Sequence, residues 1–261
     1  MFNNKKKIHS ITLVAKTNIG KERDTNEDSV ASLIINSQSF KTELNCGILV
    51  VADGMGGREM GEVASDIAVK KFIEEVVHNI FHSSENKDKL NFRGILTKAI
   101  EASNKEVRMI SENKQNPVGT TLVGAIIVDK HVFIANVGDS RAYLLKPNKS
   151  ILQITKDHSV VQEMIDGKMI TKEQAQNHPR RNVVTKALGL AESVEPDIFE
   201  VDMKDDTLIL CSDGLYGMVD DLEISKTMNG NIYKSAEALI SLANKQGGLD
   251  NISVALANYC A

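Results

Sequence analysis

Residues 46–57 have the sequence CGILVVADGMGG, an apolar run that ends in an aspartate and a glycine-rich turn. Such an apolar run is typical of a buried strand. An aspartate at the end of the strand places its carboxylate at the rim of the sheet, and glycines let the backbone approach a ligand closely. The stretch around Asp53 and Gly54 therefore predicts a strand with a binding site at its end.

The same combination recurs at four other places in the chain. Each is a short acidic motif beside an apolar run, and together they contain Glu27 with Asp28, Asp139, Asp213 and Asp250. Two carboxylates 4 Å apart repel each other by about 4 kcal/mol at an effective dielectric constant of ~20. Several such repulsions would rival the stability of a whole domain, about 5–15 kcal/mol. If the fold brings the motifs together, the cluster needs cations, so we expect a metal site.

The remaining elements follow from hydrophobic periodicity. Apolar residues that recur every three or four positions predict helices over 61–81, 91–113 and about 233–245. Short apolar runs predict strands over 8–17, 29–35, 46–52, 120–128, 131–137, 142–146, 151–155, 198–202, 207–212 and 252–258. The polar region 157–195 has only short helical segments, around 160–166 and 171–176. Strands in consecutive runs with helices in pairs predict an α+β protein whose helices cover antiparallel sheets.

The composition narrows the class of protein. With 261 residues and 42% hydrophobic content, the chain can form one large domain or two small ones, and we expect a single domain over residues 1–261. A net charge of −4, with no basic run beyond residues 5–7, argues against nucleic acid as a partner. The chain has no apolar run of about 18 residues, so we expect no membrane span. Cys46, Cys211 and Cys260 lack Cys-x-x-Cys spacing, which argues against zinc and disulfides and fits a cytoplasmic protein.

The acidic motifs favour a hard divalent cation. Carboxylates and carbonyls without a nearby His or Cys pair suit Mg²⁺, Mn²⁺ or Ca²⁺ rather than Zn²⁺. Taken singly, each motif is also an ordinary turn, and only their joint occurrence beside strands favours a metal site. A nucleotide-binding turn fits less well, because Gly54-x-Gly56 lacks a third glycine and Glu62 stands where a P-loop needs lysine.

Arg23 lies five residues before Asp28. A guanidinium beside a metal cluster can hold a phosphate with two hydrogen bonds. The alternative is that Arg23 only neutralises its neighbours Glu22 and Asp24. A cysteine nucleophile is excluded. A Cys-x₅-Arg motif would need arginine six residues after Cys211, and that position is Gly217.

Together these motifs resemble those of metal-dependent protein phosphatases of the protein phosphatase 2C (PPM) type, in their bacterial form. The resemblance extends from about Thr12 to Asn258 and includes Gly119-Thr120-Thr121 and the segment from Asp157 to Asn182. It implies that Arg23 grips the substrate phosphate and that Glu27 and Asp28 orient metal-bound waters. The implied metal ligands are the Asp53 carboxylate, the Gly54 carbonyl, Asp213 and Asp250, with Asp139 at a third, weaker site.

The resemblance also implies a fold and an activity. The expected fold is a four-layer α-β-β-α sandwich of two antiparallel β-sheets flanked by pairs of helices, with a mobile flap over about residues 159–190. The expected reaction is hydrolysis of phosphoserine and phosphothreonine in proteins by hydroxide bound at a binuclear Mn²⁺ or Mg²⁺ centre, without a phosphoenzyme. The expected partners are phosphorylated proteins, including substrates of Ser/Thr kinases and the kinase itself, and the enzyme is expected to be a cytoplasmic monomer in bacterial signalling.

Two positions depart from the family pattern. Animal relatives often have His where this chain has Met55, and bacterial relatives often have His where it has Arg58. The general acid is therefore open, and Arg58 either adds positive potential or only caps the surface of the next helix. We expect His158 and His178 to be structural or flap residues, because no nucleophile is paired with them.

Two other functions remain open. One is a phosphatase dedicated to a single phosphoserine switch protein, as in sporulation and stress responses. Arg23 argues against it, because those relatives often lack this arginine. The other is a non-catalytic, phosphoprotein-binding pseudophosphatase, which would be expected to have lost some metal carboxylates, whereas none is missing here.

Overall fold

Two antiparallel β-sheets pack face to face in the computed structural model, which describes residues 10–38, 43–56, 60–82, 90–111 and 118–260. One sheet contains, in spatial order, β1 (Ser10–Asn18), β11 (Ile252–Cys260), β10 (Thr207–Cys211), β7 (Arg141–Leu145) and β8 (Ile151–Gln153). The other contains β2 (Asp28–Gln38), β3 (Glu43–Met55), β5 (Leu122–Val128), β6 (His131–Val137) and β9 (Asp197–Asp202). The short β4 (Gly119–Thr120) pairs with the end of β3. The sheets therefore bring the ends of strands distant in sequence into one region.

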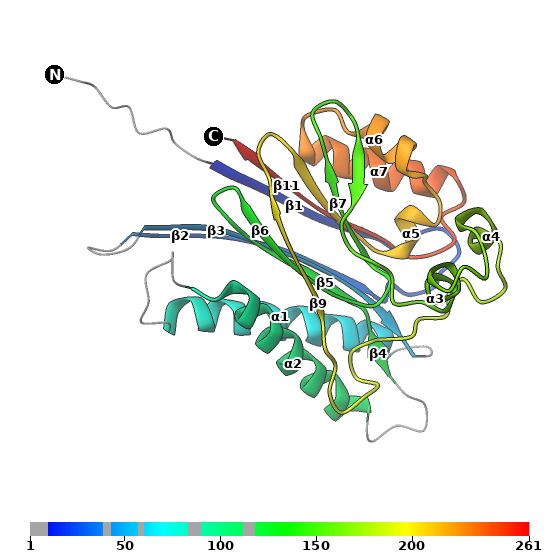
Figure 1. Cartoon of the computed structure of the whole chain (residues 1–261), viewed down its shortest axis with the longest axis horizontal. Coiled ribbons are helices and arrows are strands. Elements are labelled where there is room, and N and C mark those ends of the chain that lie inside the picture. The colour runs from blue at the N-terminus through cyan, green and yellow to red at the C-terminus, as the bar shows by residue number, and fades with distance from the viewer. Residues whose placement is uncertain (1–9, 39–42, 57–59, 83–89, 112–117, 261) are drawn as a thin grey trace.

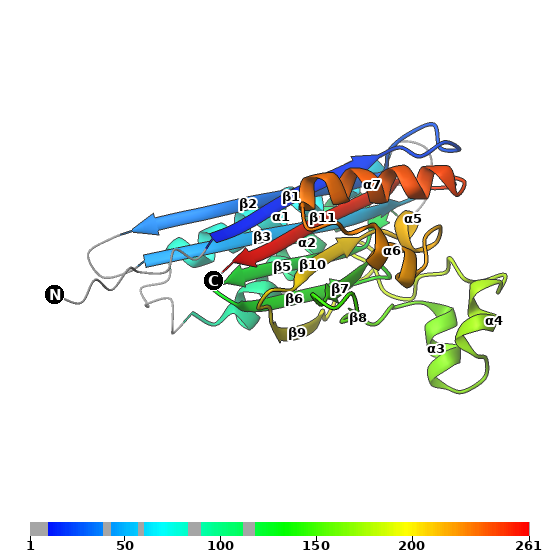
Figure 2. The same cartoon turned by 90° about the horizontal axis from the view of Figure 1, so that it is seen from above.

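Helices cover the outer faces of the two sheets (Figure 1). The long helices α1 (Gly61–His82) and α2 (Phe92–Ser111) lie against the sheet that contains β3. On the other sheet lie α6 (Asp221–Thr227) and α7 (Ile232–Lys245), with the four-residue α5 (Asp213–Tyr216) at the end of β10. The α-β-β-α order predicted for the chain is confirmed. Two further short helices, α3 (Val160–Asp166) and α4 (Lys172–Gln176), stand beside the sandwich (Figure 2).

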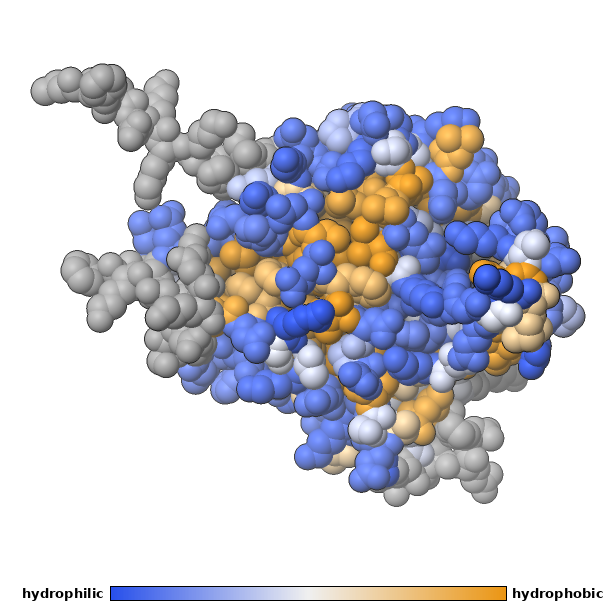
Figure 3. Space-filling model, in the orientation of Figure 1, coloured by the Kyte–Doolittle hydropathy of each residue, from blue (hydrophilic) through white to orange (hydrophobic). Residues whose placement is uncertain are grey.

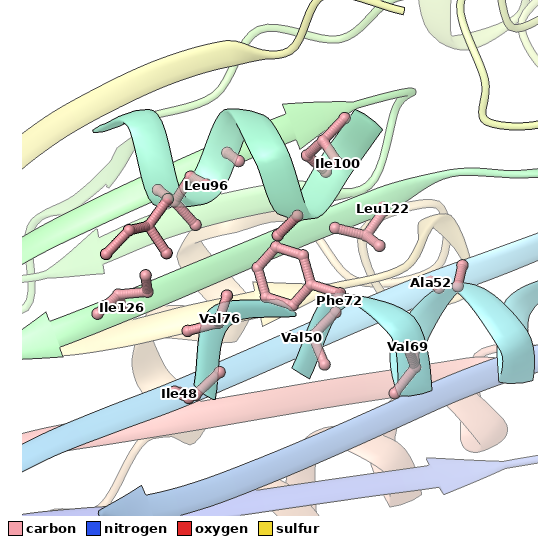
Figure 4. Close-up of a cluster of buried hydrophobic side chains, with 14 of the residues drawn as sticks. Ile48, Val50, Ala52, Val69, Phe72, Val76, Leu96, Ile100, Leu122 and Ile126 are labelled. Carbon is pink, nitrogen blue, oxygen red and sulfur yellow. The ribbon is translucent and has the colours of Figure 1, made fainter. Parts of the chain in front are cut away.

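The core under α1 and α2 shows why these elements pack as they do. Phe72 on α1 is fully buried among aliphatic side chains of β3, β5 and α2 (Figure 4). Gly124 on β5 makes room for this ring, because a Cβ at that position would lie 2.4 Å from Phe72 Cζ. The alternation of buried residues along β3 places Val50 in this core and Val51 in the core between the sheets. Both faces of β3 are thus buried, which accounts for its continuous apolar run.

Some element boundaries differ from those predicted. The strand predicted over 120–128 is interrupted at Thr121, and the strand predicted over 151–155 ends at Gln153. The helices α5 and α6 were not predicted. Asp213, which was expected only to follow a strand, also begins the helical turn α5. Residues 8, 9, 112 and 113, which belonged to predicted elements, lie outside the described residues.

One edge of the sandwich carries an apolar surface. The edge strands β8 and β9 belong to different sheets, and Figure 2, in which both are labelled, shows them on the same side of the sandwich, the side that faces the viewer of Figure 1. Figure 3 shows apolar residues at the centre of this face, with polar residues around them. Phe199 and Val201 on β9 pack against the inter-sheet core and are only partly buried.

Among the described residues, no helix is both long enough and apolar enough to cross a membrane.

Candidate metal centre

Residues from five distant parts of the chain line one cavity of about 870 Å³. Asp53 comes from the end of β3, Asp139 from the turn between β6 and β7, and Asp213 from the start of α5. Asp250 comes from the loop before β11, and Glu27 from the segment before β2. Four of the five acidic motifs therefore reach the cavity through strand ends. The fifth motif contributes Glu27 to the cavity lining. Its neighbour Asp28 is buried and does not line the cavity.

The electrostatics of this cluster match the repulsion expected from the sequence. Burial raises the pKa of Asp28 to about 8, and hydrogen bonds from Ser253 and Ser212 only partly oppose the shift. Burial also raises the pKa of Asp139 to about 8 and that of Asp213 to about 6, with a neighbouring carboxylate adding to each shift.

Asp53 has the most strongly perturbed environment. Burial, followed by the charges of Asp28, Asp213 and Asp139, raises its pKa well above the usual range. Carboxyl groups perturbed in this way at a cavity are characteristic of functional sites.

The donor set fits hard divalent cations. Within the described ranges, no three Asp, Glu, His or Cys side chains already form a cage for an ion. The acids are instead satisfied by one another and by Arg23: Asp213 shares a hydrogen bond with Asp53, and Arg23 Nη2 lies 2.7 Å from Asp250 Oδ2. Because the converging donors are all oxygens, they suit Mn²⁺ or Mg²⁺ better than Zn²⁺.

Gly54 occupies a position that excludes any side chain. A Cβ there would lie 2.1 Å from the carbonyl oxygen of Gly61 and 2.6 Å from that of Glu27. The Gly54 amide donates a hydrogen bond to the same Glu27 carbonyl at 3.1 Å. The backbone beside Asp53 is therefore held tightly between the start of α1 and the segment that carries Glu27.

Hydrogen bonds fix the backbone of Asp53 and the side chain of Asp28. The Asp53 amide donates to Thr121 Oγ1 at 3.0 Å, and the Asp53 carbonyl accepts from the Thr121 amide at 2.9 Å. Ser212 Oγ donates to Asp28 Oδ2 at 2.7 Å. These contacts link β2, β3 and β10 at the end of the sandwich where the site lies.

Asn251 organises the segment that carries Arg23, a role that the sequence did not predict. Its side-chain nitrogen donates to the carbonyls of Ile19 and Thr25, each at 2.9 Å. Its side-chain oxygen accepts from the Glu27 amide at 2.8 Å. The available signal was its position directly after Asp250, in the motif already identified.

The turn that carries Asp139 is fixed by a half-buried arginine. Arg141 forms a bidentate pair with Asp157, with Nη2 2.7 Å from Asp157 Oδ2. The Arg141 guanidinium also stacks 3.6 Å from the centroid of the Tyr216 ring, and the Tyr216 hydroxyl donates to the Asp139 carbonyl at 3.0 Å.

The segment between β8 and β9 forms one wall of the cavity. Its residues Asn182, Val183 and Val184 line the site. The Val160 amide donates to the Val183 carbonyl at 2.9 Å, which ties this wall to the start of α3.

The two histidines of this segment make structural contacts. His158 Nδ1 accepts from the Gly138 amide at 3.0 Å, and His178 Nδ1 accepts from the Arg180 amide at 3.1 Å. Met55 lines the cavity, whereas Arg58 lies outside the described residues.

Arg23 contacts the acidic cluster and is not paired with its sequence neighbours. Its ion pair is with Asp250, and the guanidinium is about half exposed at the cavity. Hydrogen bonding and attraction to Asp250 raise the pKa of Arg23, although burial acts in the opposite direction as the largest single effect. Neutralisation of Glu22 and Asp24 therefore does not account for its position.

Comparisons with known proteins agree with this site. Residues 22–252 match the family model described as "Protein phosphatase 2C". The chain is 41% identical over 249 residues to the serine/threonine phosphatase stp of Listeria monocytogenes, which covers 92% of this chain and 93% of the relative. The structure of the S. agalactiae serine/threonine phosphatase superposes with a TM-score of 0.82 at 29% identity, over 95% of this chain and 99% of that one. The catalytic domain of the phosphatase PstP with two manganese ions gives 0.78 at 30% identity, over 97% of this chain and 100% of that one.

Proposed function

Because this chain belongs to the protein phosphatase 2C family and is a serine/threonine protein phosphatase, we propose that Asp53, Asp213 and Asp250 hold its two catalytic metal ions. The Gly54 carbonyl is a further ligand, and Asp139 serves a third, weaker site. The observation that supports this assignment is the convergence of these acids in one cavity with raised pKa values for Asp53, Asp139 and Asp213. The ions are Mn²⁺ or Mg²⁺.

When bound, such ions lower the pKa of coordinated water and neutralise charge on the phosphate. The protein supplies the positions of the reacting groups. Arg23 binds the substrate phosphate with its guanidinium, which lies at the cavity and already contacts one carboxylate. Glu27 and the buried Asp28 accept hydrogen bonds from water at the inner edge of the site and so orient it.

The proton donor to the leaving oxygen is not a histidine of the described part of the cavity, since none lines it. Met55 stands at the position in question and has no proton to give. A carboxyl group of the site or a water molecule is left for this step.

The remaining assignments concern the setting of the enzyme. We infer that residues 1–261 form one catalytic domain, with residues 159–190 as the flap whose inner wall is formed by Asn182, Val183 and Val184. The enzyme is a cytoplasmic monomer that opposes Ser/Thr kinases and acts on their substrates or on the kinase itself.

One experiment tests the metal assignment directly. Purified protein should hydrolyse p-nitrophenyl phosphate and a phosphothreonine peptide with added Mn²⁺ and lose both activities in excess EDTA. Calorimetric titration of the metal-free protein with Mn²⁺ should show two strong sites and one weaker site. Activity that survives the chelator, or a titration in which Asp53→Asn binds Mn²⁺ as the wild type does, would overturn the assignment.

A further inference from the structure

The outer rim of the cavity carries acids that the metal centre does not use. Among the residues described around the cavity, seven are acidic and Arg23 is the single basic residue. Five of the acids belong to the proposed metal and water-orienting set. The other two, Glu22 and Asp24, flank Arg23 in the sequence and are exposed. They are the carboxylates that remain uncompensated when cations fill the centre.

Neither Glu22 nor Asp24 has a protein partner within the described part of the chain. Lys21 and Arg23 are the nearest basic residues in the sequence. The Arg23 guanidinium pairs with Asp250. Asp250, Glu27 and Asp213 are the carboxylates that raise its pKa most, against the opposing effect of burial. One carboxylate on each side of a phosphate-binding arginine repels the phosphate of the substrate. This repulsion lowers affinity unless the substrate itself brings a positive charge.

Another part of the cavity lining is apolar. Val183 is 43% exposed, and Val184 and Met55 are half-buried beside it. Backbone hydrogen bonds from Val160 to Val183 and from Thr185 to His158, at 2.9 and 2.8 Å, hold this wall in place. A substrate in the cavity therefore meets apolar side chains as well as carboxylates that have no protein partner among the described residues.

We propose that Glu22 and Asp24 are specificity-determining residues that select phosphorylated segments with lysine or arginine close to the phosphorylated residue, and disfavour segments with acidic flanks. This inference rests on the proposed function, because it takes Arg23 as the phosphate-binding group between the two carboxylates. The selection acts through charge and not through a fixed pair of contacts, so it should weaken as salt rises.

The test uses three phosphothreonine peptides that differ only in the residues on both sides of the phosphothreonine: lysine, glutamine or glutamate. The wild-type enzyme with Mn²⁺ should show kcat/KM in the order lysine, glutamine, glutamate, with about a three- to tenfold span for exposed charges of this kind. The double variant E22Q/D24N should compress the span to within about twofold, and E22K/D24K should reverse the order. Comparing the peptides on the same enzyme preparation cancels any loss common to all of them.

A matched control makes the same charge change away from the cavity. Glu101 on α2 and Asp205 after β9 are exposed, and neither lines the cavity. The variant E101K/D205K should keep the wild-type order and span. A span that persists in E22Q/D24N, or that shrinks equally in E101K/D205K, would overturn the inference. If the wild type hydrolyses neither the peptides nor p-nitrophenyl phosphate, the proposed function itself fails, and that outcome is distinct from an unselective but active enzyme.

Discussion

Asp28 and Asp53 stand directly opposite each other as Cα partners in the antiparallel pairing of β2 with β3. Like charges at opposed positions of a sheet destabilise it, and here the charge of Asp28 is among the effects that raise the pKa of Asp53. The pair therefore costs the metal-free protein stability. A cation held by the proposed ligand Asp53 would remove this cost, and the strand register would then couple folding to metal binding.

Replacing Asp53 separates these two effects. We expect Asp53→Asn to lose about 100-fold or more in kcat with Mn²⁺, since a metal ligand contributes several kcal/mol to the transition state. The same change removes a buried like charge, so the metal-free variant should melt at a higher temperature than the metal-free wild type. Steady-state hydrolysis and thermal melting in EDTA check the two halves. Wild-type turnover in Asp53→Asn would show that it is not a ligand.

The pH dependence of the metal-free protein follows from the raised pKa values. Asp28 and Asp139 have a pKa of about 8 when folded, against about 3.9 in an unfolded chain. Between these values the folded state binds more protons, so stability is greatest at low pH and falls as pH rises through about 8. Burial lowers the pKa of His158, so this residue makes stability rise with pH, but only below the usual histidine pKa of 6.5.

Melting curves in EDTA should therefore show a falling transition temperature from about pH 6.5 to about pH 8.5. Stabilisation by Mn²⁺ should grow over the same range, because metal binding releases protons. The variant Asp139→Asn removes one of the titrating groups and should flatten the curve. A transition temperature that stays level or rises over this range in EDTA would contradict the electrostatic description of the site.

Arg23 should act mainly on substrate binding. Arg23→Ala removes charge-assisted hydrogen bonds worth about 1.5–3 kcal/mol, so KM for a phosphopeptide and Ki for inorganic phosphate should rise about 10- to 100-fold. Arg23→Lys keeps the charge but not the two-pronged geometry and should fall between the two. Initial-rate kinetics with phosphate as inhibitor distinguish these cases. An unchanged KM would return Arg23 to the role of a partner for Asp250 alone.

The parts of the fold that depend on local pattern could be predicted from the sequence. The strand over His131–Val137 and the helix over Val160–Asp166 occur at the predicted residues, because apolar periodicity and an N-cap such as Ser159 act within a few residues. The helical turn Asp213–Tyr216 was missed. It has only four residues, and its Gly214 fits against the Asn251 backbone, where a Cβ would lie 2.0 Å from the Asn251 carbonyl oxygen.

Contacts between distant segments could not be derived in the same way. The pairing of Arg23 with Asp250 joins residues 227 positions apart, and the contact of Asn251 with Ile19 joins residues 232 apart. The sequence indicated that acids would converge at strand ends. The partner of each acid, however, depends on the register between paired strands and on how the two sheets pack. A shift of one residue in β2 against β3 would move Asp28 to the other face of its sheet.

Gly54 should tolerate no side chain. In Gly54→Ala the new Cβ would lie 2.1 Å from the Gly61 carbonyl oxygen, a backbone atom that cannot move aside without shifting α1. We expect a loss of about 1–3 kcal/mol in the free energy of unfolding, together with weaker Mn²⁺ binding. Gly167→Ala is the control, because its nearest neighbour is the flexible end of Met169 at 3.1 Å. Chemical denaturation measures the free energy of unfolding of both variants, and equal losses in the two would contradict the prediction.

Asn251 should link stability to substrate binding through the segment that carries Arg23. Asn251→Ala leaves the carbonyls of Ile19 and Thr25 without their donor, so we expect a loss of about 1–3 kcal/mol in the free energy of unfolding. Release of this segment should also raise KM for a phosphopeptide, because Arg23 would no longer be held at the cavity.

The control for this variant is Asn244→Ala. The Asn244 side chain makes two comparable hydrogen bonds, to Asn18 Oδ1 and to the Ile240 carbonyl, at 3.0 and 3.1 Å. Its loss should lower stability by a similar amount and leave KM near the wild-type value, since neither partner belongs to the segment between Ile19 and Glu27. Parallel denaturation and kinetics on the two variants then separate general destabilisation from misplacement of Arg23. Equal rises in KM would show that Asn251 contributes to the fold alone.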